Sequence, residues 1–264
     1  LWNYWLNANN EVKKLIEDII SGKAEVIIWE GEKGVSVHGK RVTLNINNSL
    51  LGITVQLRFK GLKGVTIRAP NVFRKTMNKE EYVKFINDIL KALKGGLEES
   101  DGFVDRGKAS MGTTQVWQVI VWSLLYFGKM HVRMDAVNVN ENNVTVSYYL
   151  RSNHDSLKGK ILSDANKLSE NGLLAFMFTA ILGDGSVMIV KNGRGYDAAV
   201  IKITMSSERF NRWEPLLNRL WDRFKWHKYP NSTADDVVFY SGNAIDLARA
   251  MINILPSILK DILD

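Results

Sequence analysis

Apolar positions recur along this chain with two different periods. Residues 11–21 carry apolar side chains three and four positions apart, the spacing of one helix face, and the stripe ends at Gly22. Between residues 24 and 74 the pattern changes to short runs with a period of two, separated by Gly, Asn and Lys, which predicts β-hairpins. A helical period returns at residues 78–96, where the closing glycines are expected to end the helix.

The second half of the chain continues with longer elements. Residues 113–129 are strongly apolar and predict a buried helix, because the stretch is too long for a typical strand. Residues 131–150 alternate on both sides of an Asn-rich turn and predict a hairpin. From residue 172 onward the order is helix, two strands, helix, two strands and helix. We therefore predict an α+β fold with two domains, a β-rich one at residues 1–155 and an αββαββα unit with an antiparallel sheet at residues 165–264.

Composition narrows the class of protein. The chain has 264 residues and a formal net charge of +7, and residues 1–164 hold most of the excess, with 23 Lys and Arg against 17 Asp and Glu. A basic chain favours an anionic partner, nucleic acid first. The absence of Cys excludes disulfides, thiol catalysis and Cys-ligated zinc. No apolar stretch is long enough for a membrane span, and without a signal-like start we expect an intracellular protein.

An unusual feature is the carboxylate between two glycines at Gly183-Asp184-Gly185, directly after an apolar helix. An acid at the negative end of a helix dipole is locally unfavourable, and a divalent cation held by the carboxylate and a backbone carbonyl would compensate. The alternative interpretation is a glycine helix cap followed by a tight turn. Small residues recur every four positions on this helix and predict a close contact with a second helix; they are Ala175, Thr179 and Gly183.

The stretch Met177–Gly185, with the sequence MFTAILGDG, resembles the signature helix of the LAGLIDADG homing endonuclease family. The αββαββα order that follows is similar to the repeating half of that family, over about residues 170–264. The resemblance implies a pair of packed helices whose tips hold a divalent metal, usually Mg²⁺, and sheets that read double-stranded DNA in the major groove. It implies Asp184, with the carbonyl of Gly183, as metal ligand, and Lys260 as a basic catalytic residue near the site.

Two sets of polar residues are candidates for DNA contacts. In the C-terminal unit they are the strand residues of a polar sheet face and their neighbours, namely Lys191, Arg194, Lys202, Thr204, Lys225, His227 and Lys228. In the N-terminal part they belong to a basic stretch without acids, and they are Arg58, Lys60, Lys63, Arg68, Arg74 and Lys75. An ordinary half-exposed sheet and a solvated loop face are the alternatives for the two sets.

A metal site of this type needs a second acid. The best upstream match by residue type is the helix that ends at Gly128-Lys129-Met130, where lysine would replace the acid, and neither Asp101 nor Asp135 is expected to fit the motif. The N-terminal part is then a degenerate second copy or an unrelated β-rich domain. We favour a monomer with pseudo-two-fold halves over a homodimer that brings two Asp184 residues together.

Three functions follow from these observations. The first is an endonuclease that hydrolyses phosphodiesters of double-stranded DNA at a long recognition site, with Mg²⁺ or another divalent cation. The second is a DNA- or RNA-binding protein on the same scaffold that has lost cleavage, such as a regulator or splicing factor. The third is a protein-interaction module in which Asp184 belongs only to a turn.

Overall fold

The chain forms two compact units in the computed structural model. The structure describes residues 2–28, 34–39, 41–49, 52–59, 64–140, 144–163, 167–191, 193, 195–230 and 234–263. Unit 1 comprises residues 1–69, 110–123 and 127–153, and unit 2 comprises residues 70–109, 124–126 and 154–264. Residues 70–109 thus join the C-terminal part of the chain, which the sequence pattern did not predict. Among the described residues, no helix is long and apolar enough to cross a membrane.

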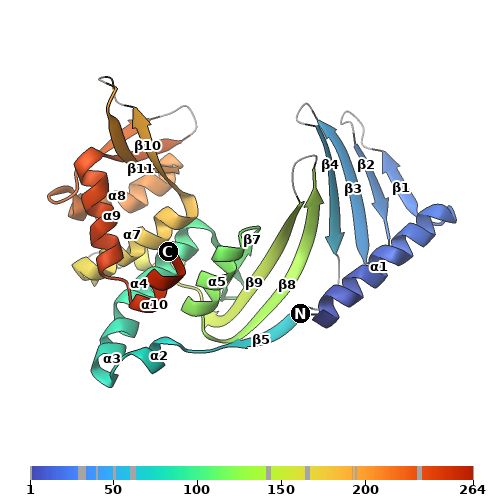
Figure 1. The fold of residues 1–264 in the computed structure, drawn as a ribbon, viewed down its shortest axis with the longest axis horizontal. Coiled ribbons are helices and arrows are strands. Elements are labelled where there is room, and N and C mark those ends of the chain that lie inside the picture. The colour runs from blue at the N-terminus through green and yellow to red at the C-terminus, as the bar shows by residue number, and fades with distance from the viewer. Residues whose placement is uncertain are drawn as a thin grey trace. The chain divides into compact units, whose positions relative to one another are not determined.

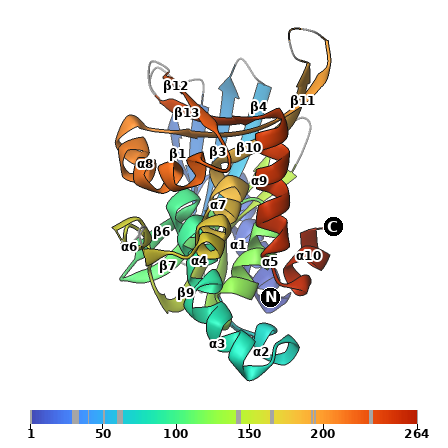
Figure 2. The same cartoon turned by 90° about the vertical axis from the view of Figure 1, so that its left-hand side faces the viewer.

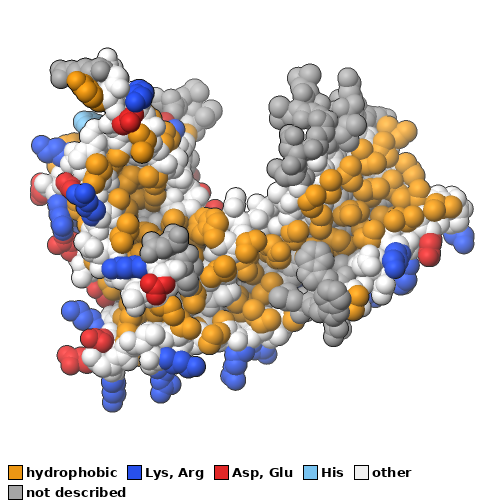
Figure 3. Space-filling model, viewed as in Figure 1, with side chains coloured by type: hydrophobic (Ala, Val, Ile, Leu, Met, Phe, Trp, Pro, Cys, Tyr) orange, Lys and Arg blue, Asp and Glu red, His pale blue; other side chains and the backbone are white. Residues whose placement is uncertain are grey.

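Unit 1 is built on an antiparallel sheet (Figure 1). Its elements are α1 (Trp2–Ile20), β1 (Glu25–Ile28), β2 (Gly34–His38), β3 (Val42–Ser49), β4 (Gly52–Phe59), β5 (Val65–Ala69), most of β7 (Lys108–Thr113), most of α5 (Val116–Leu125), β8 (Gly128–Val139) and most of β9 (Val144–Asp155). Helix α1 packs on the apolar face of the sheet, where Leu15 contacts a cluster that includes Val37 and Val42. Hydrophobic side chains also cover this face beside α1 (Figure 3).

Unit 2 places helices against a smaller sheet (Figure 2). Its elements are α2 (Phe73–Thr76), α3 (Lys79–Asn87), α4 (Ile89–Ser100), β6 (Gly102–Asp105), α6 (Lys160–Ser163), α7 (Glu170–Asp184), β10 (Gly185–Lys191), β11 (Asp197–Met205), α8 (Ser207–Trp221), β12 (Trp226–Pro230), β13 (Asp235–Tyr240), α9 (Ser241–Asn253) and α10 (Ser257–Leu263). Ile201, Ile203 and Phe239 of the sheet are buried with Trp213 and Leu217 of α8.

The element order αββαββα occurs twice in the chain. It runs from α7 to α9, as predicted for residues 170–264, and it also runs from α4 to α6. The strand order repeats as well: the smaller sheet is β10-β11-β13-β12, and the larger sheet contains β6-β7-β9-β8, extended by β4-β3-β2-β1 on one side, with β5 also pairing β8. The N-terminal part therefore contains a second copy of the C-terminal unit, enlarged by the hairpins of residues 25–59.

The helix that corresponds to α7 is α4. The prediction that the corresponding helix of the upstream copy ends at Gly128-Lys129-Met130 is therefore wrong. Gly128 begins β8, and Lys129 lies on that strand rather than at a helix tip. The prediction that the helix of residues 78–96 ends at its closing glycines is also wrong. Helix α4 continues through Gly95 and Gly96 to Ser100 and is followed by Asp101-Gly102. Asp101-Gly102 thus stands in the first copy where Asp184-Gly185 stands in the second.

Glycine is required at these positions because α4 and α7 pack closely. A Cβ added to Gly96 would lie 2.1 Å from the carbonyl oxygen of Phe176, and one added to Gly183 would lie 2.2 Å from Oγ of Ser100. Thr179 occupies the same face of α7, and its hydroxyl donates a hydrogen bond of 2.7 Å to the carbonyl of Leu93. Hence Gly96 and Gly183, which look like helix-ending glycines in the sequence, are contact positions between α4 and α7.

Replacement of Gly96 by Ala should destabilise the protein. Helix propensity alone would favour Ala by about 1 kcal/mol, but the new methyl group meets backbone of α7, which cannot move aside as a side chain can. We expect a net loss of about 2–3 kcal/mol in the free energy of unfolding, measured by urea denaturation. Gly112→Ala is the control, because no atom lies within 4 Å of the added Cβ. Equal stability of the two variants would contradict the close packing of α4 and α7.

Candidate functional site

The candidate site lies at the adjoining tips of α4 and α7. Asp101 follows the last residue of α4, and Asp184 is the last residue of α7. Oδ2 of Asp101 lies only 2.8 Å from the position that a Cβ on Gly183 would occupy, so its carboxylate rests against the residue that precedes Asp184. The two acids of the repeated unit are thereby brought to one end of the helix pair, within unit 2.

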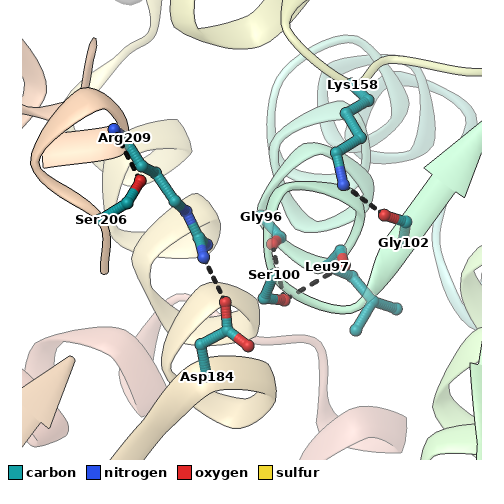
Figure 4. A network of polar contacts seen from close by, with 8 residues as sticks. All are labelled: Gly96, Leu97, Ser100, Gly102, Lys158, Asp184, Ser206 and Arg209. Carbon is teal, nitrogen blue, oxygen red and sulfur yellow. Dashed lines mark hydrogen bonds and ion pairs between the residues drawn. The ribbon is translucent and has the colours of Figure 1, made fainter. Parts of the chain in front are cut away.

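Arg209 of α8 partners Asp184 (Figure 4). Its Nη1 donates to Oδ2 of Asp184, and both side chains are mostly buried, with 16% and 28% of their surface exposed. Ser206 caps α8 by accepting a hydrogen bond of 3.2 Å from the backbone nitrogen of Arg209, which fixes the start of that helix. The guanidinium also lies 4.9 Å from the ring centre of Trp213. The negative charge of Asp184 is therefore compensated by the guanidinium group of Arg209.

The donor set at the tips suits a hard cation only in part. Carboxylate and carbonyl oxygens are the ligands that Mg²⁺ prefers, and it commonly takes one or two carboxylates together with water and phosphate. Asp101 and Asp184 with the nearby carbonyl of Gly183 meet that requirement, although Arg209 already holds one oxygen of Asp184. Among the described residues, no group of three or more acidic, His or Cys side chains could hold a metal. Other ligands would come from water and substrate.

Lys260 is not brought to this tip. It lies on α10, which follows the end of α9 remote from β10 and β13 (Figure 2). Its expected place near the site came from the resemblance to the family's later helices. Helix α9 begins directly after β13 and leads away from that strand, and α10 follows the C-terminal end of α9.

The predicted DNA-contact residues of unit 2 are largely engaged with acids. Lys191 lies 2.6 Å from Asp197, Lys202 lies 3.4 Å from Asp236, and the hydroxyl of Thr204 donates to Asp236 at 2.6 Å. Lys228 is 3.3 Å from Asp235 and 3.8 Å from the ring centre of Phe210, so it faces the helices. His227 of β12 lies beside the rings of Tyr229 on the same strand and Tyr240 on β13. Lys225 precedes β12, and Arg194 lies outside the described residues.

The basic stretch of the N-terminal part is divided between the two units. Arg58 and Arg68 lie on β4 and β5 of unit 1, while Arg74 and Lys75 lie on α2 of unit 2. Lys60 and Lys63 lie outside the described residues.

A polar face that sequence patterns alone did not reveal covers the sheet of unit 1. Side chains at directly paired positions form a hydrogen-bonded row across five strands, in the order Ser36, Asn45, Gln56, Asn138 and Thr145, with contacts of 2.7, 3.3, 2.7 and 3.5 Å. The sequence pattern did not reveal this row, because its members lie on five different strands and only the strand register brings them together.

Cations occupy the same face of the sheet next to the polar row. Arg68 pairs with Lys129, His131 pairs with Arg151, and Arg133 lies 4.0 Å from the ring centre of Tyr149. A shallow pocket of about 140 Å³ lies between Lys129, His131 and Arg151. Burial lowers the pKa of His131 below its usual value, and the positive charges of Arg133 and Arg151 lower it further. The face is therefore rich in hydrogen-bond donors and carries several cations, of which Arg133 is paired with Asp135.

No protein-family model matches the sequence, and no curated protein matches it. Among solved structures, the chain is similar to the N-terminal LAGLIDADG domain of DUF199/WhiA, with 12% identity, a TM-score of 0.37, and 65% of this chain and 85% of that chain covered. It is also similar to full-length DUF199/WhiA from Thermatoga maritima, with 10% identity, a TM-score of 0.37, and 66% of this chain and 57% of that chain covered. A third similar structure is the homing endonuclease I-WcaI bound to its DNA recognition sequence, with 10% identity, a TM-score of 0.39, and 70% of this chain and 85% of that chain covered.

Each of the two acid-tipped helices leads directly into two strands of the same repeated order. The chain therefore has an α+β fold with two αββαββα copies, the arrangement that its sequence resemblance to the LAGLIDADG family implies. The helix that repeats α7 is α4, which ends in the sequence Leu-Lys-Gly-Gly-Leu-Glu-Glu-Ser-Asp-Gly at residues 93–102. A signal for it existed: Asp101-Gly102 follows an amphipathic helix in the same way as Asp184-Gly185 follows α7.

The contact between Asp184 and Arg209 should be energetically coupled. A double-mutant cycle with Asp184→Asn and Arg209→Met should give a coupling of about 1–3 kcal/mol in the free energy of unfolding, since each single change leaves a mostly buried polar partner unsatisfied. The pair of Lys191 and Asp197 is the control, because both side chains are well exposed and such pairs contribute about 0–1 kcal/mol. Coupling no larger than that of the control would remove Arg209 from the site.

Proposed function

We propose that this chain is an endonuclease of the LAGLIDADG type that binds double-stranded DNA at a long site and hydrolyses its phosphodiesters. The observation that carries the proposal is the presence of both acids, Asp101 and Asp184, on the tips of one packed helix pair within one chain. The family resemblance requires two such acids, and the sequence motif alone had revealed only one. Because one chain supplies both, we propose that it acts as a monomer, inside the cell where its substrate lies.

Asp101 and Asp184 would hold the divalent cation of this proposal, Mg²⁺ first, with the carbonyl of Gly183 as a further oxygen donor. Bound there, such a cation supplies an activated water and stabilises the leaving oxygen of the phosphodiester. The residues of the chain do the rest: the α4–α7 contact fixes the distance between the two carboxylates, and Arg209 orients one of them.

The polar face of unit 1 supports DNA as the partner. Asn and Gln amides and Arg guanidinium groups are the side chains that contact base edges in the major groove, and Lys and Arg neutralise phosphates. Arg58, Arg68, Lys129 and Arg151 provide those groups from neighbouring strands, whereas Arg133 forms an ion pair of 2.7 Å with Asp135. The paired cations of unit 2 provide less charge, so we propose that unit 1 dominates the electrostatic part of binding.

The second candidate function is a DNA- or RNA-binding protein without cleavage. The ion pair between Arg209 and Asp184 favours it, because a guanidinium that already neutralises the carboxylate competes with a metal ion for the same oxygen. Cleavage of a DNA library in the presence of Mg²⁺ separates the two candidates.

Asp101→Asn and Asp184→Asn should each reduce Mg²⁺-dependent cleavage by at least about 100-fold, since each removes a charged ligand of the cation, while duplex affinity measured in Ca²⁺ stays within a few fold. The substrate is a randomised duplex library, followed by gel and sequencing. Asp197→Asn, an exposed acid of the same unit, is the control. Cleavage by the wild type that both variants retain would refute the assigned acids. Tight binding without any cleavage by the wild type would select the second candidate.

Arg151→Ala should weaken duplex binding and lower the slope of log affinity against log salt by about 1, because one phosphate contact is lost. The measurement is a fluorescence anisotropy titration of a labelled duplex between low and moderate salt. Arg249→Ala on α9 is the control, since that side chain is 74% exposed and belongs to the helix layer. An unchanged slope in the Arg151 variant would place the DNA on another surface.

A further inference from the structure

Unit 2 contains a pocket that lies away from Asp101 and Asp184 at the tips of α4 and α7. It is formed where the end of α3 meets the first half of α4 and the end of β9, and its volume is about 360 Å³. Its wall includes Asn87, Leu90, Lys91, Lys94, His154 and Leu157. Lys94 precedes Asp101 by seven residues on the same helix, which corresponds to about 10 Å along the axis. The pocket is therefore separate from the candidate metal site.

Lys94 is the central polar group of this pocket. The residue is only 8% exposed, yet it lines the pocket, and its Nζ lies 3.5 Å from Nδ1 of His154 and 4.9 Å from the ring centre of Tyr126. Lys91, one helical turn earlier, is exposed at the same wall. Two ammonium groups and an imidazole thus converge on one cavity beside the amide of Asn87.

The acids near this pocket are already committed to other donors. Glu98 is fully buried and accepts hydrogen bonds from the hydroxyls of Tyr126 and Ser156 and from the backbone nitrogens of residues 157 and 158, so its acceptor capacity is used. Asp155 lies at the pocket wall and forms an ion pair of 2.8 Å with Lys108. The acids at and near the pocket are therefore already engaged, whereas Lys91, Lys94 and His154 line its wall.

We propose that this pocket binds a small phosphorylated ligand. Its phosphate would lie against Lys91, Lys94 and His154, and its apolar body would contact Leu90 and Leu157. The volume falls in the range of small-molecule pockets. Most of the wall is polar, with Ile86, Leu90 and Leu157 as its apolar part. The phosphate group could belong to a free small molecule or to a DNA backbone, and competition with a duplex distinguishes these sources.

The titration of Lys94 gives the proposal a second readout. Burial lowers the pKa of Lys94 to about 8, and the negative charge of Glu98 opposes this shift. The other titratable groups at the pocket are Lys91, His154 and Asp155. A bound phosphate favours the ammonium form and raises this pKa, so binding at pH 8 should take up protons. By linkage, the affinity should then fall as the pH rises through about 8.

The test is isothermal titration calorimetry of the full chain with phenyl phosphate at pH 8, in two buffers of different ionisation enthalpy. We expect saturable binding with proton uptake, and a loss of at least about 10-fold in affinity for both Lys91→Met and Lys94→Met. Lys13→Met on α1 is the control, because that side chain is exposed in unit 1. Lys91 is exposed, so its variant tests the site even where the change at buried Lys94 impairs folding.

Absence of saturable binding by the wild type, or equal affinity in the Lys91 variant and the control, would overturn the proposal. The source of the phosphate is decided by adding a duplex. If the site accepts DNA phosphates, the duplex displaces phenyl phosphate, and Lys91→Met weakens duplex binding. If it accepts a free ligand, phenyl phosphate binds equally with and without the duplex, and both results support a phosphate site.

Discussion

The close contact between α4 and α7 is the constraint on which the candidate site depends. Two helices can approach so closely where one of them carries no side chain at the point of contact. Gly96 faces the backbone of Phe176, and Gly183 faces Ser100 near the tips. The hydroxyl of Thr179 adds a hydrogen bond across the contact rather than a bulky group. As a result, Asp101 and Asp184 come to one place, although 83 positions separate them in the sequence.

The repeat explains why one chain is enough for such a site. Two αββαββα copies place two acid-tipped helices in one molecule, and their strands form sheets of the same internal order. The two copies differ in the size and the side chains of their sheets. The sheet of the first copy is extended by the hairpins of residues 25–59, which contribute most of the hydrogen-bonded polar row. The sheet of the second copy has four strands, and its cations are mostly paired with acids. The two copies thus differ in the chemistry of their sheets more than in the order of their elements.

Periodicity was sufficient to predict the α+β class, the order of elements after residue 170 and the small-residue face of α7. It was insufficient for α4, because glycine near the end of a helical pattern has two physical meanings. It ends helices by adopting a positive φ, and it also permits close packing within a helix. Gly95 and Gly96 have the second role here, which depends on Ile161 and Phe176 and so cannot be inferred from local sequence. The row from Ser36 to Thr145 was hidden for a related reason, since only strand register brings its members together.

The two acids of the site are not equivalent, and this difference has a chemical consequence. In α8 the third residue is Arg209, and four positions later Trp213 supports it; in α5 the residues at the same spacing are Gln118 and Trp122. A glutamine donates hydrogen bonds but brings no charge, so the two helices present different groups at corresponding positions. The negative charge of Asp184 is compensated by Arg209. In the proposed function, a cation bound by Asp184 would share that carboxylate with Arg209, and the strength of this ion pair would bear on whether the protein cleaves DNA or only binds it.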